Sequence, residues 1–287
     1  MSVQIIVDSA CDIPIGEAQR LGLIFLPLKT IIDGVEYLDG VTISPDEFYK
    51  KLASCKEIPT TSQVPPSDFS NAYGQALSTH DEVLVITLSS KISGTYQSAV
   101  IARGEHDGKV WVVDSESACV GERALVDYAV RLRDAGMSAG EIADELNVAR
   151  KRICLLALVD TLKYLHKGGR LSRGSTLLGT VLRIKPVLSG VNGELAVLGK
   201  VRGTRQGYNF VNDIIQKRGI DFSMPMMFGY SGSDDSRLRE YLENSRGVWD
   251  KLEGDIPVCA VGSTIGAHVG PGFVAMAFFA GEEGQNV

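Results

Sequence analysis

The chain has 287 residues, a formal net charge of −6 and a hydrophobic fraction of 44%, which is typical of a folded globular protein and excludes a disordered or fibrous one. At this length two packed domains are favoured over one overgrown core. The 31 glycines stand beside only 10 prolines, so collagen and low-complexity sequence are excluded and many tight turns or close backbone approaches are indicated.

In the first half, short runs of β-branched and aliphatic residues alternate with helical patterns. The predicted buried strands cover residues 5–7, 23–28, 83–88 and 110–113, and the predicted helices start at Ser44 and Ser67 and cover 121–134 and 138–152. At the first helix Ser44 is the N-cap, Pro45 takes the first helical position and Glu47 closes a capping box with Ser44. The alternation predicts a doubly wound parallel sheet with helices on both faces over residues 1–152.

The second half opens with the apolar run 153–159 and then becomes rich in glycine and basic residues. Apolar runs within 187–201 are interrupted by Asn192-Gly193, which predicts a hairpin. Residues 258–261 and 273–279 are two further predicted strands, and a glycine-rich loop is expected between them. We expect a smaller α+β domain over residues 153–287.

The net charge hides an asymmetry between one basic stretch and the rest of the chain. Residues 163–205 hold nine lysines and arginines against Glu194 alone, a net charge of +8, which leaves −14 for the remaining residues. Such a stretch indicates an anionic ligand or an acidic partner. The alternative is a solvated face whose acidic neighbours come from elsewhere in the fold.

Hydroxyl side chains gather where the predicted strands end, which is where open parallel sheets bind their ligands. These clusters contain Ser9, Thr60, Thr61, Ser62, Ser93, Thr95 and Ser115. The loop Ser93-Gly94-Thr95 precedes a predicted helix, so its backbone N–H groups and the helix dipole favour a carboxylate or phosphate. The alternative is that Ser93 or Thr95 only caps that helix.

Several common chemistries lack their motifs in this sequence. It contains no phosphate-binding loop, no dinucleotide fingerprint, no nucleophile elbow and no metal-ligand spacing of histidines. We therefore expect no cofactor, no metal and no catalytic residues. Among the histidines, His268 is unusual because Gly266, Gly270 and Gly272 surround it. That setting indicates a fixed loop near a ligand or partner, or a histidine that only bonds backbone.

The same residues resemble the DegV family, whose members act as the fatty-acid-binding subunits (the FakB type) of bacterial fatty acid kinase. The matching segments, in the family order, are residues 7–14, 59–66, 93–99, 113–115, 168–172, 184–188, 200–202 and 266–272. Each motif is short, but eight of them in order across nearly the whole chain are specific.

The resemblance implies that a long-chain fatty acid is buried between two domains, with its carboxylate bound by Thr61 and Ser93. The spacing before Ser62-Gln63 favours Thr61 over Thr60. Further head-group neighbours would come from Ser9, Ser62, Gly94, Thr95 and His268. A separate ATP-dependent kinase subunit would make acyl-phosphate for phospholipid synthesis, and a basic rim would face it, formed by Arg170, Arg173 and Arg202.

The sequence also sets expectations for location. No apolar run reaches the roughly 18 to 20 residues that span a bilayer, and the N-terminus lacks the pattern of a signal peptide. We expect a cytoplasmic bacterial protein that touches a membrane surface only transiently, for lipid exchange.

Two other functions compete with this interpretation. A free-standing serine hydrolase or phosphotransferase would use Ser93 as nucleophile and His268 as base, and would need a third, orienting group such as Asp8, Asp12 or Asp114. A nucleic-acid-binding module would use the basic stretch, but the sequence pI near 5.3 argues against it.

Overall fold

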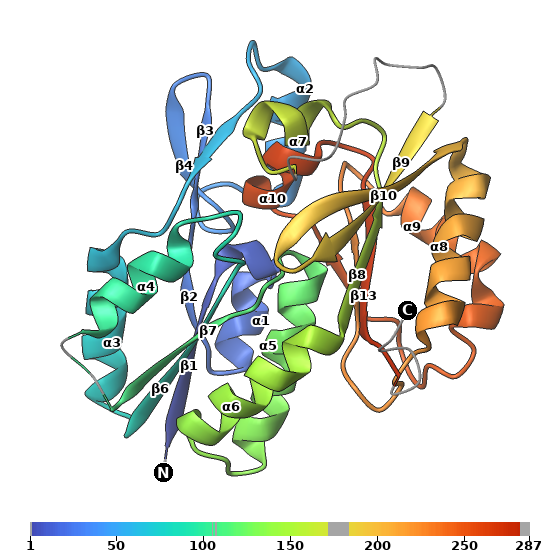
Figure 1. Ribbon diagram of the computed structural model, residues 1–287. Coiled ribbons are helices and arrows are strands. Elements are labelled where there is room, and N and C mark those ends of the chain that lie inside the picture. The colour runs from blue at the N-terminus through green and yellow to red at the C-terminus, as the bar shows by residue number, and fades with distance from the viewer. Residues whose placement is uncertain (1, 105, 107, 172–183, 282–287) are drawn as a thin grey trace.

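The computed structural model describes residues 2–104, 106, 108–171 and 184–281 (Figure 1). Its first half is built on a parallel sheet with the strand order β2-β1-β6-β7. The strands are β1 (Val3–Asp8), β2 (Ile24–Leu26), β6 (Glu82–Thr87) and β7 (Val110–Asp114). β1 is buried along its whole length, because a parallel sheet is covered on both faces.

Helices cover both faces of this sheet, which confirms the predicted doubly wound layers. α3 and α4 pack together on one face, and α1, α5 and α6 lie on the other (Figure 1). The helices are α1 (Ile15–Arg20), α3 (Pro66–Leu77), α4 (Thr95–Arg103), α5 (Val120–Asp134) and α6 (Ala139–Ala149), and the 3-10 turns are η1 (Ser9–Cys11) and η2 (Arg150–Arg152). α3 begins one residue earlier than predicted, at Pro66, and Ser67 does not cap it.

A small antiparallel sheet, which the sequence did not predict, stands at the carboxyl edge of the parallel strands. Its order is β4-β3-β5, formed by β3 (Lys29–Ile32), β4 (Val35–Leu38) and β5 (Thr60–Ser62). α2 (Pro45–Ser54) lies beside it and has the predicted capping box, in which Ser44 and Glu47 exchange both hydrogen bonds. This sheet matters because β5 carries Thr61.

The second half is built on a mixed sheet with the order β10-β9-β8-β13-β11-β12. Its strands are β8 (Ile153–Leu158), β9 (Ile184–Val191), β10 (Glu194–Arg202), β11 (Met227–Tyr230), β12 (Val258–Ala260) and β13 (Val274–Phe279). The predicted hairpin is β9 and β10, and its turn residues Asn192 and Gly193 have φ of 51° and 83°, which is the left-handed backbone that a tight hairpin turn requires.

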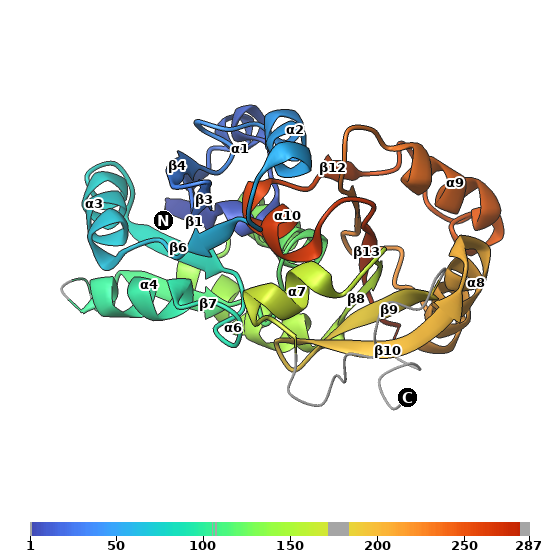
Figure 2. The same ribbon diagram turned by 90° about the horizontal axis from the view of Figure 1, so that it is seen from above.

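The remaining helices separate into an outer pair and a pair near the first half. α8 (Thr204–Arg218) and α9 (Ser236–Asn244) cover the outer face of the mixed sheet, with η3 (Arg246–Val248) after them. α7 (Lys163–Gly168) and α10 (Ser263–Val269) pack on each other near the small sheet (Figure 2). The glycine-rich segment between β12 and β13 was expected to be a loop. It is helix α10, and His268 lies on it.

The alternating side chains of β8 explain how the two halves join. Leu155 and Ala157 face the core that contains β1, β6 and α5, whereas Leu156 and Leu158 face α8. α5 therefore lies between the two sheets and contacts strands of both.

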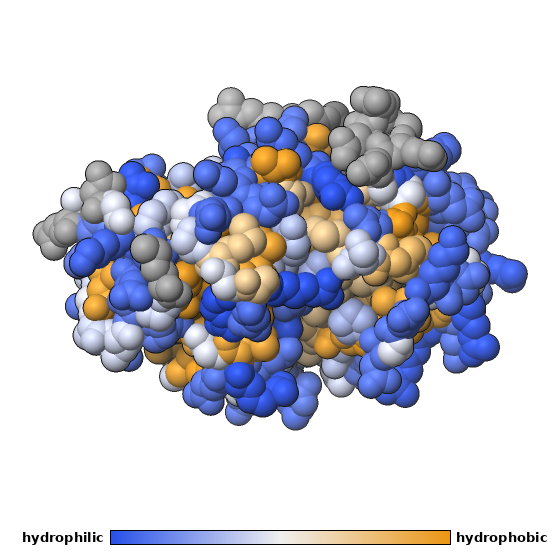
Figure 3. All heavy atoms as spheres, turned by 90° about the horizontal axis from the view of Figure 1, so that it is seen from below, coloured by the Kyte–Doolittle hydropathy of each residue, from blue (hydrophilic) through white to orange (hydrophobic). Residues whose placement is uncertain are grey.

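Hydrophilic side chains cover most of the face seen from below, with apolar groups interspersed (Figure 3). No helix in the described ranges is long and apolar enough to cross a membrane.

The chain crosses between the two halves more than once. β8 begins at Ile153, but α10 comes from the second half and packs against β3, β5 and α2 of the first. The domain boundary after residue 152 stays a prediction.

Candidate functional site

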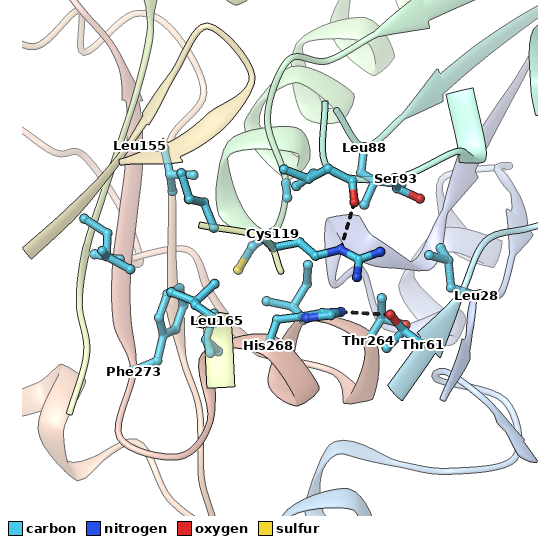
Figure 4. Close-up of a pocket in the computed structure, with 18 of the residues that line it drawn as sticks. Leu28, Thr61, Leu88, Ser93, Cys119, Leu155, Leu165, Thr264, His268 and Phe273 are labelled. Atoms are coloured by element: carbon cyan, nitrogen blue, oxygen red, sulfur yellow. Dashed lines mark hydrogen bonds between the residues drawn. The ribbon is translucent and has the colours of Figure 1, made fainter. Parts of the chain in front are cut away.

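A cavity of about 330 Å³ lies between the two halves, within the range of about 300–1,000 Å³ that small-molecule sites occupy. The close-up in Figure 4 shows two kinds of wall. Leu155, Leu165 and Phe273 lie at one end. The hydroxyl groups of Thr61, Ser93 and Thr264 lie at the other, beside Leu28 and Leu88. The cavity is therefore amphiphilic, with hydroxyl groups at one end and hydrocarbon at the other.

Thr61 reaches the cavity because β5 alternates. Thr60 is exposed, and Thr61 is partly buried in the cavity wall. The Thr61 Oγ1 atom lies 2.8 Å from Nε2 of His268. The sequence predicted both residues near a head group, and the fold brings them together from strand β5 and helix α10.

Ser93 lies on the loop between β6 and α4. Its Oγ accepts a hydrogen bond from the Thr95 backbone N–H at 3.2 Å and lies 3.0 Å from Thr95 Oγ1. Gly94 and Ser62 also line the cavity, whereas Thr95 is fully buried behind Ser93. A Cβ on Gly94 would lie 2.0 Å from Gln63 Oε1, so the amide of Gln63 packs directly on the backbone of this loop.

His268 is neutral at physiological pH. Burial, and then the positive charge of Arg170, lower the pKa of His268 to about 4. Its Nδ1 finds no hydrogen-bond partner in the described part of the chain, and the backbone of Gly168 packs against that atom. A buried N–H without an acceptor is costly, so we assign the proton to Nε2. Thr61 then accepts from His268 and keeps its own hydroxyl proton for a ligand.

Ser9 and Arg170 lie differently with respect to the cavity. Ser9 does not line the cavity: it donates to Asp39 and accepts from the Leu28 N–H, both at 3.0 Å, beside a separate groove. Arg170, expected on the rim, lines the cavity. Arg170 follows Gly169, whose backbone is left-handed and turns the chain back. The guanidinium of Arg170 therefore donates hydrogen bonds to the carbonyls of Ile92 and Gly168.

Arg202, the other predicted basic residue that the structure describes, is not among the residues that line the cavity. Arg202 is exposed on β10, and Arg173 falls outside the described residues. Lys185 of the same stretch is paired with Asp160 at 2.6 Å. The prediction that Arg170, Arg173 and Arg202 face a partner stays a prediction.

Sequence reasoning missed Thr264 as a cavity residue. Its hydroxyl is buried and has no partner within the described ranges, and Figure 4 shows it beside Thr61. Thr264 precedes His268 by four residues, so the two share one face of a helix. That spacing would have identified it if the segment had been predicted as a helix.

The orienting acids that a hydrolase would need are engaged elsewhere. Asp8 accepts from the N–H groups of Ala10 and Leu88, and Asp12 accepts from that of Gly262. Burial raises the pKa of Asp8 to about 7 and that of Asp12 to about 8. Asp114 bonds loop N–H groups of residues 90 and 116. These bonds fix strand-end loops, and within the described residues none of the three acids reaches His268. Among the residues described, no group of three or more histidine, cysteine, aspartate or glutamate side chains could hold a metal ion.

Fold and cavity together define a class: a two-domain α/β protein with an amphiphile-shaped cavity between its domains. The sequence pattern of the DegV family, described as an uncharacterised protein family, matches residues 2–281. A DegV domain-containing protein of Caldanaerobacter subterraneus is 37% identical over 278 residues, which cover 94% of this chain and 95% of that protein. The chain belongs to the DegV family.

Solved structures of similar proteins agree over the whole length. A DegV family protein from Thermus thermophilus, described for its fatty acid binding, has a TM-score of 0.87 and 31% identity, covering 98% of this chain and 100% of that one. DegV of Bacillus subtilis, described as a fatty acid binding protein, has a TM-score of 0.83 and 26% identity, with coverage of 98% and 100%. The structural neighbours are thus fatty-acid-binding proteins of this family.

Proposed function

We propose that this protein binds one long-chain fatty acid in the cavity between its two halves, with the carboxylate at Thr61 and Ser93 and the tail toward Leu155 and Phe273. The observation that carries the proposal is the amphiphilic cavity, in which two hydroxyl groups face hydrocarbon walls. The neighbours described as fatty-acid-binding proteins support the ligand class.

Tail and head group have different tasks in this proposal. Burying a tail of about 14 methylenes gains on the order of 11 kcal/mol before the costs of association. A hydrogen bond to a charged carboxylate adds only about 1.5–3 kcal/mol. The tail therefore sets most of the affinity, and Thr61 and Ser93 set the orientation, with Thr264 as a further hydroxyl for the head group.

Arg170 supplies the positive charge for this end of the cavity. Two N–H groups of Arg170 already donate to the carbonyls of Ile92 and Gly168. Arg170 therefore stabilises a bound anion through its positive charge and does not need to form hydrogen bonds to both carboxylate oxygens. An oxygen left free of a bidentate clamp can attack a phosphoryl group. A head group held by hydroxyls suits a carboxylate that must react.

We further propose that the bound acid is presented to a separate ATP-dependent kinase, which forms acyl-phosphate for phospholipid synthesis in the cytoplasm. Arg202 is exposed on β10, so its charge is available to an acidic partner. In this role the chain is not catalytic by itself and needs no cofactor.

A hydrolase using Ser93 and His268 is less well supported. His268 Nε2 faces Thr61, Ser93 faces Thr95, and the lowered pKa of His268 makes it a weak base. Hydrolysis of simple esters by the purified protein alone would favour the hydrolase over the binding protein.

Native mass spectrometry of the purified protein, followed by lipid extraction under denaturing conditions, tests the ligand class. We expect a copurified long-chain fatty acid at close to one per chain. A protein that carries no lipid and does not take up added palmitic acid would overturn the proposal.

A further inference from the structure

We propose that Asp39, Ser263 and Thr30 form a positioning network that holds helix α10 in register with strand β5, and so sets the geometry between Thr61 and His268. The inference rests on the proposed function, because it gives these buried residues a role in recognising the carboxylate. They are positioning residues, since none of the three lines the cavity.

The network begins at the Asp39 carboxylate, which is 2% exposed. One oxygen accepts from the backbone N–H and the hydroxyl of Ser263, at 2.7 and 2.8 Å. The other accepts from the hydroxyl of Ser9 at 3.0 Å and from the N–H of Thr264 at 3.3 Å. A buried carboxylate is costly unless its oxygens find donors. Asp39 therefore ties the first turn of α10 to the loop that follows β1.

The direction of the next hydrogen bond follows from counting protons. Ser263 has one hydroxyl proton and gives it to Asp39. The bond of 2.9 Å between Ser263 Oγ and Thr30 Oγ1 must therefore be donated by Thr30. Thr30 is completely buried on β3. The chain of donors runs from the small sheet to α10 and ends on a carboxylate.

Thr30 and Thr61 are directly opposite each other in the pairing of β3 with β5. Side chains of directly opposed residues in an antiparallel pair lie on the same face. Thr30 thus bonds Ser263 and Thr61 bonds His268 from one face of the small sheet. Helix α10 is fixed to that sheet at two points, one near each of its ends.

The packing around α10 leaves it little freedom to take another position. A Cβ on Gly266 would lie 2.5 Å from the ring of Phe48 and 2.7 Å from the Tyr49 hydroxyl, so the helix is in close contact with α2. The Tyr49 hydroxyl also donates to the carbonyl of Val261, just before α10. The packing limits α10 to small shifts. A small shift of the helix after loss of the Thr30 bond changes the 2.8 Å distance between Thr61 and His268, its other attachment to the small sheet.

The test compares Thr30→Val with Thr30→Ser and with a matched control, Thr87→Val. Thr87 is also a completely buried strand threonine, but its hydroxyl has no partner within the described residues. Two quantities are measured: the preference for palmitic acid over hexadecanol in displacement of a fluorescent fatty acid, and the Nε2 signal of His268 in 15N NMR. The alcohol keeps the tail and lacks the carboxylate, so the ratio reports the head group.

We expect Thr30→Val to reduce the preference for the acid about fivefold, as for the loss of one net hydrogen bond, and to shift the His268 signal. Thr30→Ser should restore both readouts, and Thr87→Val should alter neither. If Thr30→Val does not fold, Ser263→Ala interrupts the same chain and should give the same two effects.

Wild-type preference together with an unmoved His268 signal in Thr30→Val or Ser263→Ala would overturn the network. If wild-type protein shows no preference for the acid, the proposed function fails instead. The His268 signal would then still decide whether Thr30 positions the ring.

Discussion

Replacing Gly168 with alanine places a methyl group against the imidazole of His268. The new Cβ would lie 2.2 Å from Nδ1 and 2.8 Å from Cε1. The ring and the methyl group must separate by about 0.8 Å merely to reach 3.0 Å, the shortest distance that real Cβ contacts show. Either the ring turns or α7 and α10 move apart. Both movements disturb the 2.8 Å bond between Thr61 and His268.

The cost of this change can be divided between fold and ligand. Overpacking of this kind lowers the free energy of unfolding by about 1–3 kcal/mol. Loss of the Thr61 contact should weaken palmitic acid binding by about 1.5 kcal/mol, or roughly tenfold, and leave hexadecanol binding unchanged. Chemical denaturation measures the first effect, and displacement of a fluorescent fatty acid measures the second.

The neighbouring glycine provides the control. Gly169 has φ of 67°, and a Cβ there would meet nothing within 4 Å. Gly169→Ala should lose about 1–2 kcal/mol of stability through backbone strain alone and keep the preference for the acid. The reasoning is refuted if Gly168→Ala binds palmitic acid as tightly as wild type and leaves the His268 NMR signal in place.

Three further predictions follow from the same geometry. Thr61→Val combined with Ser93→Ala should lower palmitic acid affinity by about 1.5 kcal/mol or more per site. The fold and the binding of hexadecanol, measured in a displacement assay, should stay intact. An unchanged affinity for the acid would show that neither residue binds the head group. Since the pKa of His268 falls from 6.5 to about 4 on folding, its contribution to stability is complete above about pH 6.5 and is lost as the pH falls to 4, up to about 3 kcal/mol. Denaturation at several pH values should show a shallower loss in His268→Gln, and an identical slope would count against a buried neutral imidazole. If the proposed kinase partner exists, Arg202→Ala should leave the lipid bound, as checked by native mass spectrometry, and slow acyl-phosphate formation when the binding protein is limiting. An unchanged rate would exclude Arg202 from the proposed contact with that kinase.

The parallel sheet could be predicted because its strands are buried on both faces and form continuous apolar runs, as in β1 and β6. The small sheet could not, since its strands are only three or four residues long and include the polar β5. The segment of α10 was predicted as a loop because the helix is short and glycines lie within it and at both of its ends. In both cases contacts with the rest of the fold, and not local preference, decide the structure.

The candidate site, like the fold, could be predicted only in part from the sequence. Thr61, Ser93 and His268 were expected near a head group, and the fold brings them to one cavity. Ser9 bonds Asp39 and does not line the cavity. The strand-end rule locates an edge of the sheet, but it does not identify the partner of a hydroxyl group there. Arg170 reaches the cavity through a left-handed turn at Gly169, and sequence spacing alone does not show which way such a turn points.

The most direct test of the account is a crystal structure of the protein with palmitic acid. We predict carboxylate oxygens within hydrogen-bond distance of Thr61 Oγ1 and Ser93 Oγ, and a tail that runs between Leu155, Leu165 and Phe273. A carboxylate at the hydrocarbon end of the cavity, or a fatty acid bound only outside it, would contradict the account.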